Sequence, residues 1–254
     1  MVIYLNKAAL ITGGGTGIGK GIAIELAKDG YDVAFSFMSS EKKAEAVKKE
    51  IESLGCKALA IKADLSKVSG VNKLFDTFEK EFTRLDLFVN NAGVTEKSEF
   101  LETTEEIFDS MCNLDYKGAF FCMQRAAKYM IKKEIQGNMI VISSNNAKAH
   151  FADVSVYGSA KAAVTKLAEH VAIELAKYKI RVNTIAPGWT ETGSARLDDK
   201  ESTFYKIPLN NWTTPEEIAN AVKYLAGAKS VTGVTLVIDN GALLVSDKRE
   251  RYGF

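Results

Sequence analysis

The sequence predicts an α/β fold: one doubly wound domain whose seven-stranded, mostly parallel sheet carries helices on both faces. Short β-type runs alternate with segments of helical apolar spacing along the whole 254-residue chain. This alternation is typical of parallel strands joined by crossover helices. No linker rich in Pro, Gly or Ser interrupts it, and no repeat or low-complexity segment occurs. We therefore predict a single domain over residues 1–254, a length that can bury a substantial core.

Seven runs of apolar residues are the predicted strands. Their apolar character is continuous rather than alternating, which is typical of strands buried on both faces of a sheet. In chain order the predicted strands are Ala8–Ile11, Val33–Phe37, Ala58–Ile61, Leu85–Val89, Met139–Ile142, Arg181–Ile185 and Thr235–Ile238.

The predicted helices between these strands each show one apolar stripe at spacings of three and four residues. Such a stripe marks the face that is buried. The clearest stripes are Ile18, Ile22 and Leu26; Ala44, Val47, Ile51 and Leu54; Leu74, Phe75, Phe78 and Phe82; and Val164, Leu167, Val171 and Leu175. The stretch 193–211 does not fit this pattern, because it is polar and irregular after a Pro-Gly pair. We predict that it forms a flap beside the substrate.

Composition excludes several classes of function. The formal charge is +1, from 33 basic and 32 acidic residues, so we expect neither nucleic acid nor an anionic membrane as a partner. The chain has no signal-peptide start and no apolar run of membrane-spanning length, which predicts a soluble, cytoplasmic protein. Cys56, Cys112 and Cys122 form no Cys-x-x-Cys pair. We assign them no chemistry, expect Cys112 and Cys122 to pack in a core, and predict no metal site.

The loop at Thr12–Gly19, TGGGTGIG, follows the first predicted strand and opens the first predicted helix. Glycines at this junction allow the backbone to approach a pyrophosphate, whose charge is met by free N–H groups at the helix start. We therefore favour a dinucleotide site of the Rossmann type over a simple structural turn. The predicted contacts are Gly13, Thr16, Gly17, Ile18 and Gly19. No Gly-Lys-Ser/Thr ending follows, which disfavours a nucleoside-triphosphate loop.

The end of the second predicted strand bears on the choice of cofactor. NAD enzymes usually place an acidic residue there for the ribose 2′-hydroxyl, whereas this chain reads FMSS from residue 37. With no carboxylate to repel a 2′-phosphate, and with Lys42 and Lys43 close behind, NADP(H) is favoured and NAD(H) remains possible. Ser39 and Ser40 are predicted cofactor contacts. A helix N-cap by either serine explains them as well, and both roles can hold together.

The pair Tyr157 and Lys161 lies four residues apart in a helical segment, which places both side chains on one face. A free phenol is a poor acid or base at neutral pH, but an adjacent ammonium favours the phenolate and makes it an effective proton carrier. Ser144 stands at the end of a predicted strand, where ligands bind in open α/β sheets. Its hydroxyl could hold a substrate oxygen beside the phenol. Ser143 is the neighbour with which it could be confused.

Together these motifs resemble the short-chain dehydrogenase/reductase family, in the common form whose length this chain matches. The resemblance covers essentially the whole chain. The motifs in order are TGGGTGIG, Asp64 of KADLS, NNAG at 90–93, Asn113 of NLDYKG, Ser144, Tyr157 with Lys161, and PGWTET at 187–192.

The resemblance implies a role for each matching residue. Tyr157 would be the general acid/base, Ser144 would orient the substrate, and Lys161 would promote ionisation of the phenol and bind the nicotinamide ribose. Asn113 would hold a water that relays protons to Lys161. Further cofactor contacts would be Asp64 at the adenine with Leu65 next to it, Asn91, Ala92 and Gly93 on the adenosine side, and Pro187, Gly188, Thr190 and Thr192 near the nicotinamide and phosphates.

Two positions depart from the usual family pattern. The commonest NADP(H) form carries a basic residue before Gly17, where this chain has Thr16, and this keeps NAD(H) possible. The triplet Asp239-Asn240-Gly241 stands where a Gly-Gly pair is more usual.

The resemblance implies NAD(P)(H)-dependent interconversion of a secondary alcohol and a ketone or lactone. It leans toward bacterial glucose 1-dehydrogenase-like members, through AAKYMIKKEIQGNMIVISS and the tail after Gly241, so we expect a sugar or polyol substrate. The alternatives are a hydroxysteroid dehydrogenase and a 3-ketoacyl-carrier-protein reductase. Residues 147–155, with Trp189, Phe204 and Tyr205, could line an apolar or sugar-stacking pocket.

Family members are usually tetramers, so the resemblance implies a homotetramer joined partly through long helices that begin near Thr104 and Ser155. Packing within one chain explains apolar residues such as Phe120 and Phe121 nearly as well. A rival from another class is a non-catalytic NADP(H) sensor. It predicts cofactor binding without turnover, and the presence of Tyr157 disfavours it.

Overall fold

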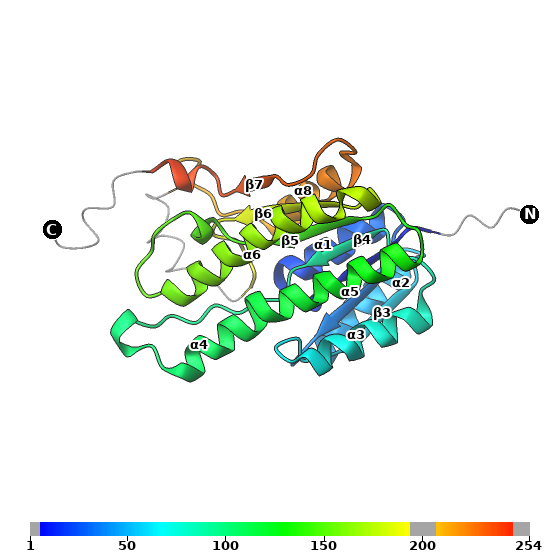
Figure 1. The fold of residues 1–254 in the computed structure, drawn as a ribbon, viewed down its shortest axis with the longest axis horizontal. Helices are drawn as coiled ribbons and strands as arrows, with labels where there is room; N and C mark the ends of the chain where they lie inside the picture. The colour runs from blue at the N-terminus through cyan, green and yellow to red at the C-terminus, as the bar shows by residue number, and fades with distance from the viewer. Residues whose placement is uncertain (1–5, 194–206, 246–254) are drawn as a thin grey trace, which may run out of the picture.

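The computed structural model describes residues 6–193 and 207–245, and a seven-stranded sheet is its centre (Figure 1). The strand order is β3-β2-β1-β4-β5-β6-β7, and every neighbouring pair is parallel. The strands are β1 (Ala8–Ile11), β2 (Asp32–Phe37), β3 (Ala58–Lys62), β4 (Leu87–Asn90), β5 (Asn138–Ile142), β6 (Arg181–Pro187) and β7 (Thr235–Ile238). The predicted doubly wound sheet is therefore confirmed, and the pairing is parallel throughout.

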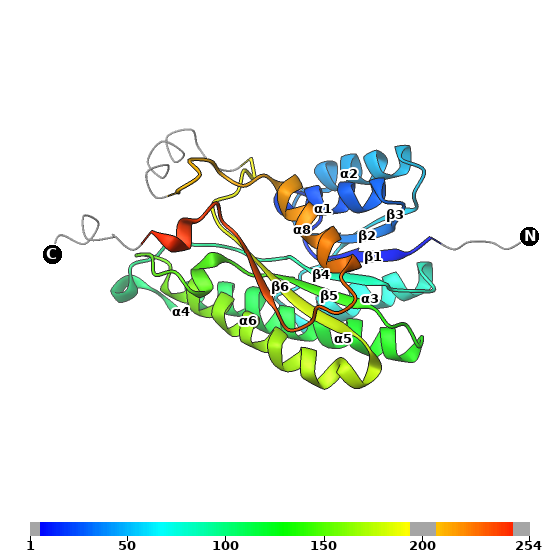
Figure 2. The same cartoon turned by 90° about the horizontal axis from the view of Figure 1, so that it is seen from above.

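Helices cover both faces of the sheet, as Figure 2 shows. One layer holds α1 (Gly17–Lys28), α2 (Glu41–Ser53) and α8 (Pro215–Gly227). The opposite layer holds α3 (Val68–Glu81), α5 (Ala119–Lys132) and α6 (Ser155–Leu175), with the short α4 (Glu105–Met111) beyond them. A seven-residue π-helix, Cys112–Gly118, joins α4 to α5. Short 3-10 helices lie at Phe100–Glu102, Asn145–Ala147, Ala176–Tyr178 and Ala242–Leu244.

Each face of the sheet has its own hydrophobic core. Successive side chains of a strand point to opposite faces, so Leu10 of β1 packs in the core beneath α3, α5 and α6, whereas Ile11 packs in the core beneath α1, α2 and α8. The stripe residues Phe75 and Phe78 are fully buried in the first core, and Ile22 is fully buried in the second. The apolar stripes therefore face the sheet, as the sequence predicts.

Two details of the prediction are corrected by the structure. Leu54, assigned to a buried stripe, is 43% exposed, because α2 ends at Ser53 and Leu54 already forms its C-terminal cap. The fourth strand begins at Leu87 rather than Leu85, because the preceding Asp86 uses its carboxylate to accept a hydrogen bond from the Ala8 backbone N–H.

The segment after β7 explains the departure at Asp239-Asn240-Gly241. The buried Asp239 carboxylate accepts hydrogen bonds from the backbone N–H groups of Gly241 and Leu243. Asn240 has a left-handed backbone (φ 53°), a conformation that asparagine tolerates better than most residues. Its amide donates to the Asn211 carbonyl, which ties this turn to the segment before α8.

The predicted flap, 193–211, lies mostly outside the described residues, as do Phe204 and Tyr205. Of the part that is described, Ile207 packs with Trp212 and Ala242 in a small cluster against Trp189. No helix within residues 6–193 and 207–245 combines the length and the apolar character needed to cross a membrane.

Candidate active site

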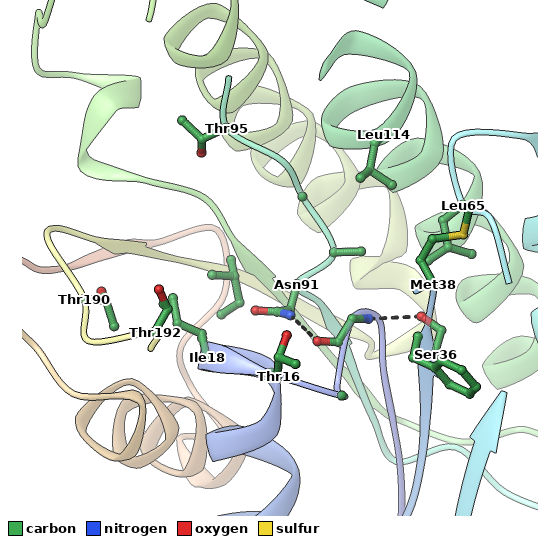
Figure 3. Close-up of a pocket in the computed structure, with 18 of the residues that line it drawn as sticks. Thr16, Ile18, Ser36, Met38, Leu65, Asn91, Thr95, Leu114, Thr190 and Thr192 are labelled. Carbon is green, nitrogen blue, oxygen red and sulfur yellow. Dashed lines mark hydrogen bonds between the residues drawn. The ribbon is translucent and has the colours of Figure 1, made fainter. Parts of the chain in front are cut away.

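A cavity of about 850 Å³ opens at the carboxyl ends of the strands, where ligands bind in doubly wound sheets. The strand order reverses here, because the chain leaves β1 toward β2 and returns on the other side as β4. All predicted cofactor contacts line this cavity: Gly13, Thr16, Gly17, Ile18, Gly19, Ser39, Ser40, Asp64, Leu65, Asn91, Ala92, Gly93, Tyr157, Lys161, Pro187, Gly188, Thr190 and Thr192. Figure 3 shows six of them, Thr16, Ile18, Leu65, Asn91, Thr190 and Thr192, converging from separate elements.

The glycine loop brings backbone against backbone. A side chain at Gly19 would overlap the Gly13 carbonyl oxygen, and Gly13 itself has a left-handed backbone (φ 69°) that favours glycine. The first turn of α1 contains no acidic residue, so its free N–H groups and the positive end of the helix dipole face the cavity uncompensated. This arrangement suits a pyrophosphate.

The loop after β4 is fixed to the glycine loop. The Asn91 amide donates to the carbonyl oxygens of Thr12 and Gly13, and the Thr12 hydroxyl accepts from the backbone N–H groups of Asn91 and Ala92. The Gly13 N–H in turn donates to the Ser36 hydroxyl of β2 (Figure 3). Asn91 therefore has a structural role in shaping the cavity as well as lining it.

The far end of the cavity lies between the ends of β2 and β3. Ser40 is the N-cap of α2, since its hydroxyl accepts from the Lys43 backbone N–H, and it also lines the cavity with Ser39. Lys43 is a lining residue whereas Lys42 is not. Asp64 lies opposite; the Ser66 hydroxyl donates to its carboxylate and lowers the pKa of Asp64.

Other lining residues are not among the predicted contacts, although Gly15, Ala63 and Leu114 lie inside the motifs of the sequence. They are Gly15, Ser36, Phe37, Met38, Ala63, Thr95, Leu114, Ile142 and Gly193. Most are ordinary strand-end or loop residues, and their types alone carry no signal of ligand contact. The reversal of strand order could have indicated the segments from which they come.

The opposite end of the cavity holds Tyr157, Lys161 and Ser144. Tyr157 is half-buried, and Lys161 is only 5% exposed, with its ammonium 5.6 Å from the centre of the Tyr157 ring. The Ile142 carbonyl oxygen lies 3.4 Å from the same ammonium. Ser144 is 6% exposed and accepts hydrogen bonds from the backbone N–H and the amide of Asn146.

Ser143 and Ser144 have different environments. The Ser143 hydroxyl lies 3.0 Å from the Lys161 carbonyl oxygen and 2.6 Å from the Thr165 hydroxyl, so it ties β5 to α6. Among the described residues, the Ser144 hydroxyl bonds only to Asn146 of its own 3-10 turn, and Ser144 lines the cavity. Both serines line the cavity, but the Ser143 hydroxyl is already engaged in joining β5 to α6. Ser144 is therefore the better candidate to hold a substrate oxygen beside Tyr157.

The Asn113 side chain lies apart from the catalytic group. It is 3.5 Å from the Lys117 ammonium, and it does not line the cavity. Two residues further on, the fully buried Asp115 lies with one carboxylate oxygen 3.9 Å from the Lys161 ammonium. The π-helix thus turns the side chain of Asp115, rather than that of Asn113, toward Lys161. The role of Asn113 in holding a water stays a prediction.

Aromatic side chains stand near the catalytic end. Phe151 and Trp189 form an edge-to-face pair with ring centres 5.3 Å apart, which links the loop before α6 to the loop after β6. Among residues 6–193 and 207–245, no three His, Cys, Asp or Glu side chains gather in an arrangement that could hold a metal ion.

A family model described as short chain dehydrogenase matches residues 7–202. The chain belongs to the short-chain dehydrogenase/reductase family. Membership makes the protein an oxidoreductase that acts on CH–OH groups with a nicotinamide cofactor.

Relatives of this short-chain dehydrogenase cover nearly its whole length. A 3-oxoacyl-(acyl-carrier-protein) reductase of Staphylococcus epidermidis is 35% identical over 242 residues, which are 93% of this chain and 99% of that one. The Escherichia coli oxidoreductase YohF, described as uncharacterized, is 34% identical over 95% of this chain and 98% of its own. Acetoin dehydrogenase from Enterobacter cloacae has a crystal structure with a TM-score of 0.89 and 33% identity, covering 96% and 99% of the two chains.

The residues of this short-chain dehydrogenase fit a nicotinamide dinucleotide. Because Gly13 and Gly19 lack side chains, the glycine loop can pack closely on itself and on the loop after β4, and the start of α1, which carries no acidic residue, offers donors to the charge of a diphosphate. Asp64 and Ser39 stand at one end of the cavity and Lys161 at the other. A bound nicotinamide would supply or accept the hydride, and a side chain of the protein would donate or accept the accompanying proton.

Proposed function

We propose that this short-chain dehydrogenase interconverts a small ketone and its secondary alcohol with NADP(H), where the ketone carries a second oxygen group close by. The observation that carries the proposal is the placement of Tyr157 and Lys161 opposite Ser144 at one end of a cavity whose other end is built for a dinucleotide. That arrangement puts a proton carrier and a carbonyl-binding hydroxyl beside the place where hydride would arrive.

Ser144 is suited to hold the substrate oxygen. Its lone pairs are engaged by the backbone N–H and the amide of Asn146, so the hydroxyl proton can be donated to a carbonyl. In reduction, Tyr157 then donates its proton to the oxygen as negative charge develops there. The ammonium of Lys161 stabilises the phenolate that remains. In oxidation the same phenolate takes the proton from the alcohol.

The relatives support the substrate class. One is named for a 3-oxoacyl thioester and another for acetoin, which is an α-hydroxyketone. Both substrates are ketones with a second oxygen group one or two carbons away. The expected sugar or polyol receives less support, because neither the reductase nor the acetoin dehydrogenase is named for one.

NADP(H) is the proposed cofactor. The turn after β2 offers hydroxyls and the ammonium of Lys43 to the cavity, and the start of α2 adds its positive helix end, which the Glu41 carboxylate in the first turn partly offsets. Thr16 carries no charge, so Lys43 is the cation that would meet a 2′-phosphate.

A homotetramer and a cytoplasmic location remain predictions. Exposed apolar side chains do gather on the 3-10 helix Phe100–Glu102, α4, the π-helix and the start of α5, as in Phe100, Phe108, Tyr116 and Phe120. A hollow of about 600 Å³ lies between these elements and α6. Sedimentation of the purified protein tests the tetramer.

The test is a nicotinamide-absorbance assay of the purified enzyme that crosses NADPH and NADH with diacetyl, acetoin, an acetoacetyl thioester, a ketosteroid and a sugar lactone. The proposal expects turnover with NADPH on the first three compounds and little on the others. Turnover confined to the steroid or the lactone would overturn the substrate class. Tight NADPH binding with no turnover on any compound would favour the non-catalytic sensor.

A further inference from the structure

Asp115 is a fully buried carboxylate beside the catalytic lysine. Its oxygen Oδ1 accepts a hydrogen bond of 3.0 Å from the Val94 backbone N–H and lies 3.9 Å from the Lys161 ammonium. Among the described residues, Oδ2 finds no hydrogen-bond partner. Buried polar atoms are nearly always paired, and a buried charge with an unpaired oxygen is costly. Burial of this kind disfavours the charged form of a carboxyl group.

The surrounding chain leaves room for this pair of charges. A side chain at Gly93 would lie 2.5 Å from Oδ1 of Asp115 and 2.9 Å from the Lys161 ammonium. A larger residue at position 93 would therefore have to displace one or both of the charged groups. Asp115 is fully buried, whereas Lys161 also lines the cavity.

Few ionisable groups face Asp115. Lys161 approaches from α6, and Cys112 lies in the same π-helix as Asp115. The Asp109 carboxylate of α4 interacts electrostatically with the Cys112 thiol. Burial raises the pKa of Asp115, and the Lys161 ammonium opposes that rise. Tyr157 lies on the other side of Lys161, with its ring centre 5.6 Å from the ammonium.

We propose that Asp115 is a positioning residue that controls, through its own ionisation, how strongly Lys161 promotes proton transfer by Tyr157. When Asp115 is neutral, the full charge of Lys161 stabilises the phenolate. When Asp115 is ionised, its negative charge offsets that stabilisation. The phenolate then receives less stabilisation from Lys161. Asp115 acts through Lys161 and touches neither substrate nor phenol.

The size of the effect follows from the distances. Oδ1 is at most ~10 Å from the centre of the Tyr157 ring, because 3.9 Å and 5.6 Å separate the two from the ammonium between them. At an effective dielectric constant of ~20, a charge at that distance moves a titration by about one pH unit. The inference rests on the proposed function, since it assigns Asp115 a part in the proton transfer.

The experiment compares wild type with Asp115→Asn, which keeps the shape of the side chain and removes its charge. In alcohol oxidation, the rising limb of kcat/KM against pH should move about one unit toward acid in Asp115→Asn. Asp76→Asn, which removes a surface carboxylate paired with Arg125, is the matched control and should leave the profile in place. Superimposable profiles for wild type and Asp115→Asn would overturn the inference.

A second measurement needs no turnover. In protein labelled with 15N-valine and 13Cζ-tyrosine, the Val94 amide resonance should shift with pH in a step that Asp115→Asn lacks, because Val94 donates to Oδ1. The Tyr157 resonance, identified with Tyr157→Phe, should titrate at lower pH in Asp115→Asn. A Val94 resonance with no step would overturn the inference even in an active enzyme. If turnover fails on every substrate but both resonances behave as described, the proposed function fails and the control of Tyr157 by Asp115 stands.

Discussion

Replacing Lys43 tests the choice of NADP(H) over NAD(H). Lys43 is the cation that lines the cavity beside Ser39 and Ser40, whereas the adjacent Lys42 does not line it. An ammonium about 4 Å from a phosphate is worth roughly 1 kcal/mol per unit charge in bulk water and about four times that near a protein surface. Lys43 is exposed, so we take about 1–2 kcal/mol for its contact with a 2′-phosphate.

Lys43→Ala should therefore raise KM for NADPH about 5- to 30-fold while KM for NADH stays within about twofold. Steady-state kinetics with both cofactors measure this, and Lys42→Ala is the matched control, since it removes the same charge one residue earlier. The effect should shrink as salt is added, because the Debye length at physiological ionic strength is only about 8 Å. An unchanged NADPH-to-NADH ratio in Lys43→Ala, or an equal loss in Lys42→Ala, would refute the reasoning.

Three further predictions concern the site and its support. Gly19→Ala should abolish cofactor binding measured by fluorescence titration, because the added methyl group overlaps a carbonyl oxygen of the glycine loop; Gly227→Ala, whose methyl group meets no atom within 4 Å, should bind normally. Ser144→Ala should lower kcat with little change in thermal midpoint. Ser143→Ala should do the reverse, losing about 1–3 kcal/mol of stability through its buried hydrogen bonds. The pKa of Asp64 is lowered in the folded state by the Ser66 hydroxyl, so its contribution is present above its unfolded pKa and lost as pH falls through the folded value. The stability difference between wild type and Asp64→Asn should thus be largest at neutral pH and vanish in acid; a difference that grows in acid would contradict it.

Much of the fold could be predicted because the local and global signals agree. The continuous apolar runs form strands buried on both faces, and the helical stripe that includes Phe75 and Phe78 packs in the core. The prediction failed at element ends. Leu54 continues the helical spacing, but α2 has already ended at Ser53. Periodicity alone cannot show where backbone hydrogen bonding stops.

The candidate site was predictable where function depends on residue type and spacing, and not where it depends on an irregular backbone. The four-residue step from Tyr157 to Lys161 lies in a regular α-helix, so spacing predicts their shared face. Asn113 and Asp115 lie in a π-helix, whose different hydrogen-bond spacing rotates side chains away from α-helical positions. A buried aspartate is also contrary to hydropathy, since a carboxylate is rarely buried without a partner. Asp115 has a partner, the Lys161 ammonium, but this group comes from α6, 46 residues away in the sequence, so the residues around Asp115 do not indicate it.

The central claim is that Tyr157 carries the proton in an alcohol–ketone interconversion. The most direct measurement compares wild type with Tyr157→Phe for NADPH affinity by fluorescence and for turnover on whichever ketone of the panel the wild type reduces. We predict unchanged NADPH affinity with a loss of rate of at least about 100-fold, the usual contribution of a positioned general acid. A Tyr157→Phe enzyme that binds NADPH and reduces the ketone at nearly the full rate would contradict it.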